Sequence, residues 1–242
     1  MYLSRLILNP RNRQVRRDLS DCQQMHRTIL SAFPRVANQD EGARSQFGLL
    51  YRVDINVRSG VVALLVQSHV EPDWNNLPGD YFLETSGDDP NPVCKIIGEK
   101  YDGLSEGMRL VFRLRANPTR RVSARSSRDE AKWHGKRVEL CREEDQLKWL
   151  ERKAEGFGFK LLSVRAASEV ANVRTINEGK TKGWKSLAGE HDHSKARLTF
   201  AAVVFEGLLT ITDADLFHKA LRGGIGSGKA YGFGLLSIAP AR

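Results

Sequence analysis

The residue best suited to proton chemistry is His26, which stands beside Arg27 in a segment with helical spacing of apolar residues. An imidazole has a pKa of about 6.5, so it accepts or donates a proton at neutral pH, as cleavage of a phosphodiester requires. Cys22, Ile29 and Leu30 share the helical face of His26. That position is also typical of a histidine packed in a core, so the pattern alone leaves a catalytic and a structural interpretation open.

A glycine-rich segment near the carboxyl end is the densest local pattern in the chain. Six of the 21 glycines fall between positions 223 and 234. The stretch Gly223 to Lys229 matches the phosphate loop G-x-x-x-x-G-K, but Ala230 stands where that loop needs a hydroxyl for Mg²⁺. A phosphate loop also runs from a strand into a helix, whereas here the predicted helix comes before the strand. A nucleotide-dependent enzyme is therefore set aside. The backbone N–H groups of Gly226 and Gly228, with Lys229, suit a phosphate backbone, and a crossover needed only for packing is the alternative.

Basic side chains alternate with apolar ones on two predicted strands. Arg113 and Arg115 lie on the face opposite Phe112 and Leu114, and Arg52 lies likewise on an earlier strand. The alternation predicts a sheet with one apolar face under helices and one open, basic face.

A second basic feature is a loop predicted from Asn177 to Ser194, which carries Lys182 and Lys185 and follows a strand with Arg174. The chain has 38 basic and 29 acidic side chains, a net charge of +9, which predicts a polyanionic partner. Nucleic acid contacts are therefore expected from Arg27, Arg113, Arg115, Arg174, Lys182 and Lys185. A solvated basic surface explains the same pattern.

Composition excludes several other classes of protein. Three widely spaced cysteines and no C-x-x-C pair argue against a disulfide scaffold and a zinc module, so neither a metal nor a cofactor is expected. The longest clean apolar run, Val61 to Val66, is six residues, whereas a membrane helix needs about 20. We expect a soluble, cytoplasmic protein with no membrane contact.

The elements that would position these residues begin with a strand over Tyr2–Leu8, followed by a basic turn. Ser20 and Gln23 have the spacing of a capping box, which predicts a helix starting near Asp21 and ending at Pro34. Alternation over 47–57 predicts a strand, and 61–67 its hairpin partner. Loops are expected over 71–107, and the strand at 109–116 closes the first unit.

The second unit is expected to open with a strand at 136–140 and a helix at 142–155. Strands are predicted at 159–165, 170–176, 196–205, 208–212 and 232–238, with a helix from 213 to 221. Each half then reads strand, helix, strand, strand, short helix, strand. The prediction is an α+β fold of two tandem ferredoxin-like (βαββαβ, RRM-like) domains, 1–117 and 136–242, joined by a linker at 118–135.

Five segments in this order resemble one family, the CRISPR-associated CasE-type endoribonucleases of the RAMP superfamily, which cut repeat RNA in the type I-E Cascade complex. The segments are Met1-Tyr-Leu-Ser-Arg, Met25-His-Arg-Thr, Phe112-Arg-Leu-Arg-Ala-Asn-Pro118, Phe205-Glu-Gly207 and Gly224-Ile-Gly-Ser-Gly-Lys229 with Gly234-Leu-Leu-Ser-Ile-Ala-Pro240. The resemblance covers nearly the whole chain.

The resemblance implies a protein that binds the stem-loop of CRISPR repeat RNA and cuts at the 3′ base of the stem. Cleavage would need no metal and would proceed by attack of the 2′-hydroxyl, leaving a 2′,3′-cyclic phosphate and maturing the crRNA. The partners would be that RNA hairpin and the other Cascade subunits. The family's catalytic histidine falls on His26, and the tyrosine that some members carry three residues earlier is Gln23 here. Because an amide transfers no proton at neutral pH, a non-catalytic RNA-hairpin-binding subunit is the alternative.

Overall fold

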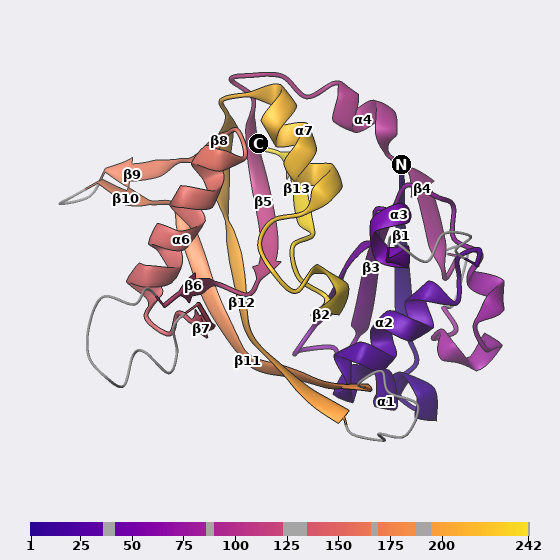
Figure 1. The fold of residues 1–242 in the computed structure, drawn as a ribbon. Helices are drawn as coiled ribbons and strands as arrows, with labels where there is room; N and C mark the ends of the chain where they lie inside the picture. The colour runs from indigo at the N-terminus through magenta and orange to yellow at the C-terminus, as the bar shows by residue number, and fades with distance from the viewer. Residues whose placement is uncertain (36–41, 86–89, 123–134, 166–168, 187–194, 242) are drawn as a thin grey trace, which may run out of the picture.

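The computed structural model describes residues 1–35, 42–85, 90–122, 135–165, 169–186 and 195–241. The chain forms two main antiparallel sheets, and a long hairpin of the second sheet extends to the helices of the first (Figure 1). Among the described residues, no helix has the length and apolar character to cross a bilayer.

The first sheet has the strand order β2-β3-β1-β4. Its strands are β1 (Tyr2–Leu8), β2 (Leu50–Ile55), β3 (Val62–Ser68) and β4 (Val93–Ile96). Helices α1 (Arg13–Ser20) and α2 (Cys22–Leu30) connect β1 to α3 (Ala43–Gln46) and β2, and the turns η1 (Trp74–Asn76) and η2 (Gly79–Tyr81) follow β3. Apolar side chains of α2 and the sheet share a core that includes Met25, Ile29, Leu6 and Leu64.

The amino-terminal helices differ from the sequence prediction. The expected basic turn is helix α1, whose cap Asn12 accepts a hydrogen bond from the N–H of Val15. Ser20 ends α1 and donates to the carbonyl of Arg17 at 2.8 Å, so it does not cap the next helix. Asp21 has the extended backbone of a cap, and its Oδ1 accepts the N–H of Gln23 at 2.9 Å.

The second sheet has the order β11-β12-β5-β13, with β8 also paired to β12. Its strands are β5 (Arg109–Ala116), β8 (Phe159–Leu161), β11 (Val173–Ser186), β12 (Lys195–Ile211) and β13 (Leu236–Pro240). Helices α6 (Glu143–Gly156) and α7 (Ala214–Gly223) share its core, and η3 (Lys229–Tyr231) lies in the glycine-rich segment. The remaining elements are α4 (Gly98–Asp102) and two small pairs, β6 (Thr119–Arg121) with β7 (Arg137–Glu139) and β9 (Ser163–Arg165) with β10 (Glu169–Ala171).

Both sheets have the strand arrangement of a ferredoxin-like unit, which confirms the predicted fold, but the assignment of β5 to the first unit was wrong. β5 pairs with β12 and β13, and its apolar face joins the second core. The fourth strand of the first sheet is β4, inside the segment predicted as loops. Its burial does not alternate, so the sequence carried no strand signal there. The strand expected at 136–140 is β7, which pairs with β6 outside the main sheet.

Two predicted connections also differ. The basic loop expected at 177–194 is strand as far as Ser186, because its backbone pairs with β12 from Val173 onward; residues 187–194 lie outside the described residues. The predicted linker at 118–135 begins with β6, and residues 123–134 are likewise outside the described part.

The two sheets are joined by hydrogen bonds from buried polar side chains. Gln67 of β3 donates to the carbonyl of Leu221 at 2.7 Å and accepts the hydroxyl of Tyr101 at 2.9 Å. Arg52 of β2 donates to the hydroxyl of Ser237 at 3.0 Å and to the carbonyl of Arg113 at 3.3 Å. The prediction that Arg52 lies on an open face was wrong, because the second sheet covers it.

Candidate active site and nucleic-acid interface

The first turn of α2 lies against β11 of the second sheet. The Oδ1 atom of Asp21, which caps α2, also accepts the N–H of Trp184 at 3.3 Å. Gly183 permits this approach, because a Cβ there would lie 2.7 Å from Sγ of Cys22 and 2.8 Å from Oδ1 of Asp21. The β11–β12 hairpin is thereby brought to the start of the helix that carries His26 (Figure 1).

The glycine-rich segment reaches the same helix from the second sheet. Gly228 and Gly232 flank η3 with φ of +78° and +84°, conformations that only glycine adopts readily. The turn presents the ring of Tyr231 to His26, with ring centroids 6.1 Å apart and an interplanar angle of 66°. Two segments more than 200 residues apart in sequence therefore meet at the imidazole.

His26 lies in an environment that keeps its imidazole neutral. Burial, and after it the charges of Arg44 and Arg27, together lower its pKa from 6.5 to about 4. Its Nδ1 atom is buried and has no hydrogen-bond partner among the described residues. At neutral pH the imidazole is therefore free to accept a proton.

The charges of Arg44 and Arg27 act on this histidine, and that of Arg44 also acts on Lys229. We call Arg27, Arg44 and Lys229 the cationic cluster. Burial lowers the pKa of Lys229, and the charges of Arg44 and Lys153 act in the same direction. Arg44 thus repels both Lys229 and protonated His26. A bound phosphate would relieve this repulsion. The sequence analysis missed Arg44, because the one-turn helix α3 that holds it has no recognisable periodicity.

Gln23 lies one turn before His26 but is covered. Gln23 is only 9% exposed. A Cβ at Gly183 of β11 would lie 3.1 Å from the backbone nitrogen of Gln23. No hydrogen bond of its side chain is found among the described residues, so a role for Gln23 in catalysis stays a prediction.

Arg113 and Arg115 both have partners inside the protein. Arg113 forms ion pairs with Asp54 at 3.2 Å and with Glu206 at 2.5 Å. Arg115 binds Glu178 at 2.6 Å and the hydroxyl of Thr181 at 2.9 Å.

Arg115 also reaches the glycine-rich segment. It donates to the carbonyl of Gly232 at 3.2 Å, and its guanidinium carbon lies 4.5 Å from the centroid of the Phe233 ring. It therefore connects β11 to this segment. Nucleic-acid contacts by Arg113 and Arg115 stay predictions.

A side chain added at Gly226 or Gly228 would point into the protein. Both have positive φ, and an added Cβ would lie 3.1 Å from Trp149 at Gly226 and 3.0 Å from Phe233 at Gly228. These contacts support the packing interpretation of the two glycines. Their backbone contact with a phosphate stays a prediction.

The basic residues of β11 are exposed. Lys182 and Lys185 have no ion pair among the described residues, whereas Arg174 lies 4.0 Å from Glu206. Lys180, by contrast, pairs with Glu139 at 2.8 Å. The hairpin therefore presents Lys182 and Lys185 as cations that an external anion can bind.

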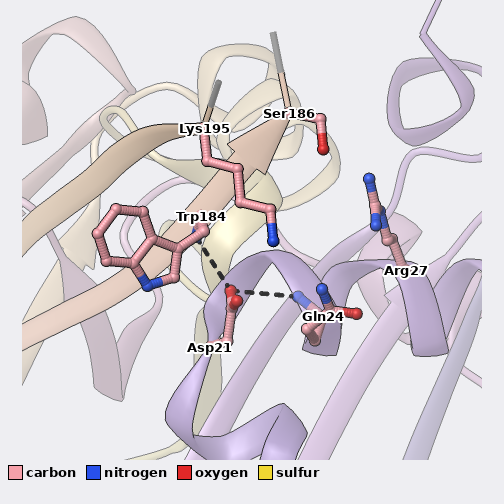
Figure 2. Close-up of a pocket in the computed structure, with 6 residues that line it drawn as sticks. All are labelled: Asp21, Gln24, Arg27, Trp184, Ser186 and Lys195. Carbon is pink, nitrogen blue, oxygen red and sulfur yellow. Dashed lines mark hydrogen bonds between the residues drawn. The ribbon is translucent and has the colours of Figure 1, made fainter. Parts of the chain in front are cut away.

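An open pocket of about 380 Å³ lies between α2 and the hairpin (Figure 2). It is lined by Asp21, Gln24, Arg27, Trp184, Ser186 and Lys195. The Lys195 ammonium and the Gln24 amide point toward one another, and Arg27 stands on the far side (Figure 2). Sequence reasoning found Arg27 but missed Gln24 and Lys195, because only the tertiary contact of α2 with β11 and β12 makes them neighbours.

Within the described ranges, no group of three or more His, Cys, Asp or Glu side chains has a geometry that could hold a metal ion.

The residues predicted for the site divide into two groups. His26, Arg27 and Lys229 come together through Arg44, while Arg174, Lys182 and Lys185 lie along β11.

Comparison with known proteins places the chain in a family. Residues 1–240 match the family model described as CRISPR associated protein. The chain is 36% identical over 241 residues to the CRISPR-associated endoribonuclease Cse3 of Thermus thermophilus, covering 99% of this chain and 100% of the relative. It is 31% identical over 244 residues to the Cascade subunit CasE of Escherichia coli, covering 99% and 100% of the two chains.

A solved structure agrees with the sequence comparisons. The structure of the CRISPR endoribonuclease Cse3 bound to a 19-nucleotide RNA matches with a TM-score of 0.75 and 33% identity, covering 99% of this chain and 100% of that one. With its whole length matched in sequence and in fold, this chain belongs to the CRISPR-associated protein family that includes Cse3 and CasE.

Proposed function

We propose that this protein is an endoribonuclease that binds the stem-loop of CRISPR repeat RNA and cuts at the 3′ base of the stem to mature crRNA. Support comes from the two full-length relatives, one named an endoribonuclease and the other a Cascade subunit. The net charge of +9 suits an RNA partner. Other Cascade subunits are the further partners that the CasE relative suggests, and a cytoplasmic location stays a prediction.

The observation that carries the proposal is a neutral, half-buried histidine whose buried Nδ1 has no partner among the described residues and which lies in the field of Arg44 and Arg27. His26 takes the proton of the 2′-hydroxyl, and the O2′–P bond forms as the P–O5′ bond breaks. The cations of Arg27, Arg44 and Lys229 stabilise the negative charge that develops on the phosphate oxygens. The leaving 5′-oxygen gains a proton from water or from an acid, and the products are a 2′,3′-cyclic phosphate and a 5′-hydroxyl.

The β11–β12 hairpin of the protein supplies the binding energy for the RNA. Lys182 and Lys185, with Arg174 farther along β11, are placed to contact the phosphates of the stem, while Lys229 lies at the bond to be cut. Backbone contacts of this kind position the RNA without reading its bases.

The test is single-turnover cleavage of a labelled repeat hairpin by the full chain. We expect cleavage in excess EDTA, a 2′,3′-cyclic phosphate product, and no cleavage when the cut site carries a 2′-deoxy sugar. His26→Ala should lower the rate by about 10²- to 10⁴-fold with hairpin affinity unchanged. His69→Ala is the matched control, because His69 is exposed and the charges that, after burial, lower its pKa belong to the amino terminus and Arg222 rather than to the cationic cluster.

Two outcomes would contradict the proposal. Tight binding of the hairpin without any cleavage would show a non-catalytic RNA-binding subunit. Cleavage of the 2′-deoxy substrate, or loss of cleavage in EDTA that Mg²⁺ restores, would show a different chemistry.

A further inference from the structure

The ring of Tyr231 is the aromatic contact of His26 in the described structure, and it comes from the other half of the chain. The two rings meet edge to face, with centroids 6.1 Å apart at 66°. Tyr231 belongs to the turn η3, whereas His26 is on α2. The contact therefore exists only when the two ferredoxin-like units are packed together.

The tyrosine ring is itself held firmly. It stacks on Phe200 of β12, with centroids 5.0 Å apart at 28°. The N–H of Tyr231 donates to the carbonyl of Gly228 at 2.8 Å, which closes the turn. The ring is thus held by its stacking on Phe200 and by the turn that carries its backbone.

The imidazole of His26, by contrast, is not oriented by a hydrogen bond within the described residues. No hydrogen bond to either ring nitrogen of His26 is found in the described part of the chain, and Nδ1 is buried without a partner. A catalytic histidine usually has one ring nitrogen oriented by a hydrogen bond. Here the tyrosine ring is the contact available to select the rotamer of the imidazole.

We propose that Tyr231 is a positioning residue for the proton transfer, whose aromatic ring holds the imidazole of His26 in its reactive orientation. This inference rests on the proposed role of His26. The ring performs the task, because the Tyr231 hydroxyl has no hydrogen bond among the described residues. Burial, with the Cys22 thiol as a second cause, raises the pKa of that hydroxyl, so it stays protonated.

The test compares Tyr231→Phe, which keeps the ring, with Tyr231→Leu, which removes it. We expect Tyr231→Phe to cleave the repeat hairpin at the wild-type rate. Tyr231→Leu should lose about 10- to 100-fold in the single-turnover rate at saturating RNA, because a misplaced reacting group slows the chemical step, with the dissociation constant of the hairpin unchanged. Tyr2→Leu, which removes a partly buried ring on β1, is the matched control.

A second readout follows the imidazole directly. In the RNA-free protein, NMR titration should show that the pKa of His26 rises toward 6.5 in Tyr231→Leu, because loss of the ring exposes the imidazole to water. The pKa should be unchanged in Tyr231→Phe. Should Tyr231→Leu not fold, Phe200→Leu removes the ring that stacks on Tyr231 and should give an intermediate loss of rate.

The outcomes separate this inference from the proposed function. If Tyr231→Leu cleaves at the wild-type rate while His26→Ala does not cleave, the positioning role is wrong and the function stands. Equal losses in Tyr231→Phe and Tyr231→Leu would also overturn it, because the hydroxyl would then carry the effect. If His26→Ala cleaves normally, His26 is not the base and the positioning role of Tyr231 is wrong as well. The proposed function itself fails only if the wild-type protein does not cleave the hairpin.

Discussion

His26 combines partial burial with the nearby charges of Arg44 and Arg27. Burial is the largest cause that keeps the imidazole neutral, and the charges of Arg44 and Arg27 act in the same direction. An RNA phosphate brings the opposite charge, which favours the imidazolium. The residue therefore becomes a better base when its substrate is bound, because the same phosphate that is cut stabilises the proton that His26 receives.

The depressed pKa of His26 predicts a pH dependence of folding. The unfolded histidine gains a proton below about 6.5, but the folded one gains it only near 4. Acidification between these values favours the unfolded state. We expect the wild-type free energy of unfolding to fall by about 2 kcal/mol more than that of His26→Asn between about pH 7.5 and about pH 5. Urea unfolding of both proteins at the two pH values measures this, and equal losses would show that His26 is not buried in solution.

At the scale of elements, the β11–β12 hairpin is a long arm whose basic side chains differ in their surroundings. Lys182 lacks an ion-pair partner in the described structure, whereas Lys180 pairs with Glu139. The paired lysine has its charge neutralised by its neighbour and releases fewer counterions on binding RNA.

We therefore expect Lys182→Ala and Lys185→Ala each to reduce the slope of log affinity against log salt by about one unit. Lys180→Ala, the matched control, should change the slope less. Hairpin binding at a series of salt concentrations measures the slopes. Unchanged slopes in Lys182→Ala and Lys185→Ala would place the RNA away from this arm.

The glycine-rich element makes a separate prediction about stability. Gly224 has φ of +73°, and an added Cβ would lie 2.7 Å from Leu50 of the first sheet. Gly224→Ala should lower the free energy of unfolding by about 1–3 kcal/mol. A Cβ added at Gly223 would have no neighbour within 4 Å. Gly223→Ala should therefore leave the free energy of unfolding within about 0.5 kcal/mol of wild type. Thermal or urea unfolding compares the two, and equal effects would refute the close approach at Gly224.

At the scale of the molecule, the site is assembled from both units, so their contact is part of the function. Arg52, only 2% exposed, joins β2 to β5 and β13 and also pairs with Asp54 at 2.9 Å. Removing one member of such a buried network leaves polar atoms without partners.

Arg52→Met should cost about 3 kcal/mol of unfolding free energy and should slow RNA cleavage, because η3 would no longer be held against α2. Arg58→Met, an exposed arginine after the same strand, should change neither. Urea unfolding followed by tryptophan fluorescence, together with the cleavage assay, measures both effects. Wild-type stability in Arg52→Met would show that this contact does not hold the units together.

Sequence periodicity was enough to predict the fold class and most elements. The alternation in β2 and β5 and the helical spacing around His26 are local patterns, and burial on one face produces them directly. Helical spacing identified His26 and Arg27 as candidates, and the glycine-rich segment identified Lys229. They could not find β4, whose exposed side chains do not alternate, or Arg44, which lies on a helix of one turn.

The sequence by itself determined which faces are apolar, where the glycines permit tight turns, and which family the chain resembles. Only the tertiary structure decided which sheet takes β5, that Arg52 is buried rather than exposed, and that Tyr231 meets His26. The physical reason is that periodicity records whether a face is covered but not by what. Strand pairing uses backbone groups that every residue shares, and the cationic cluster depends on contacts between segments distant in sequence.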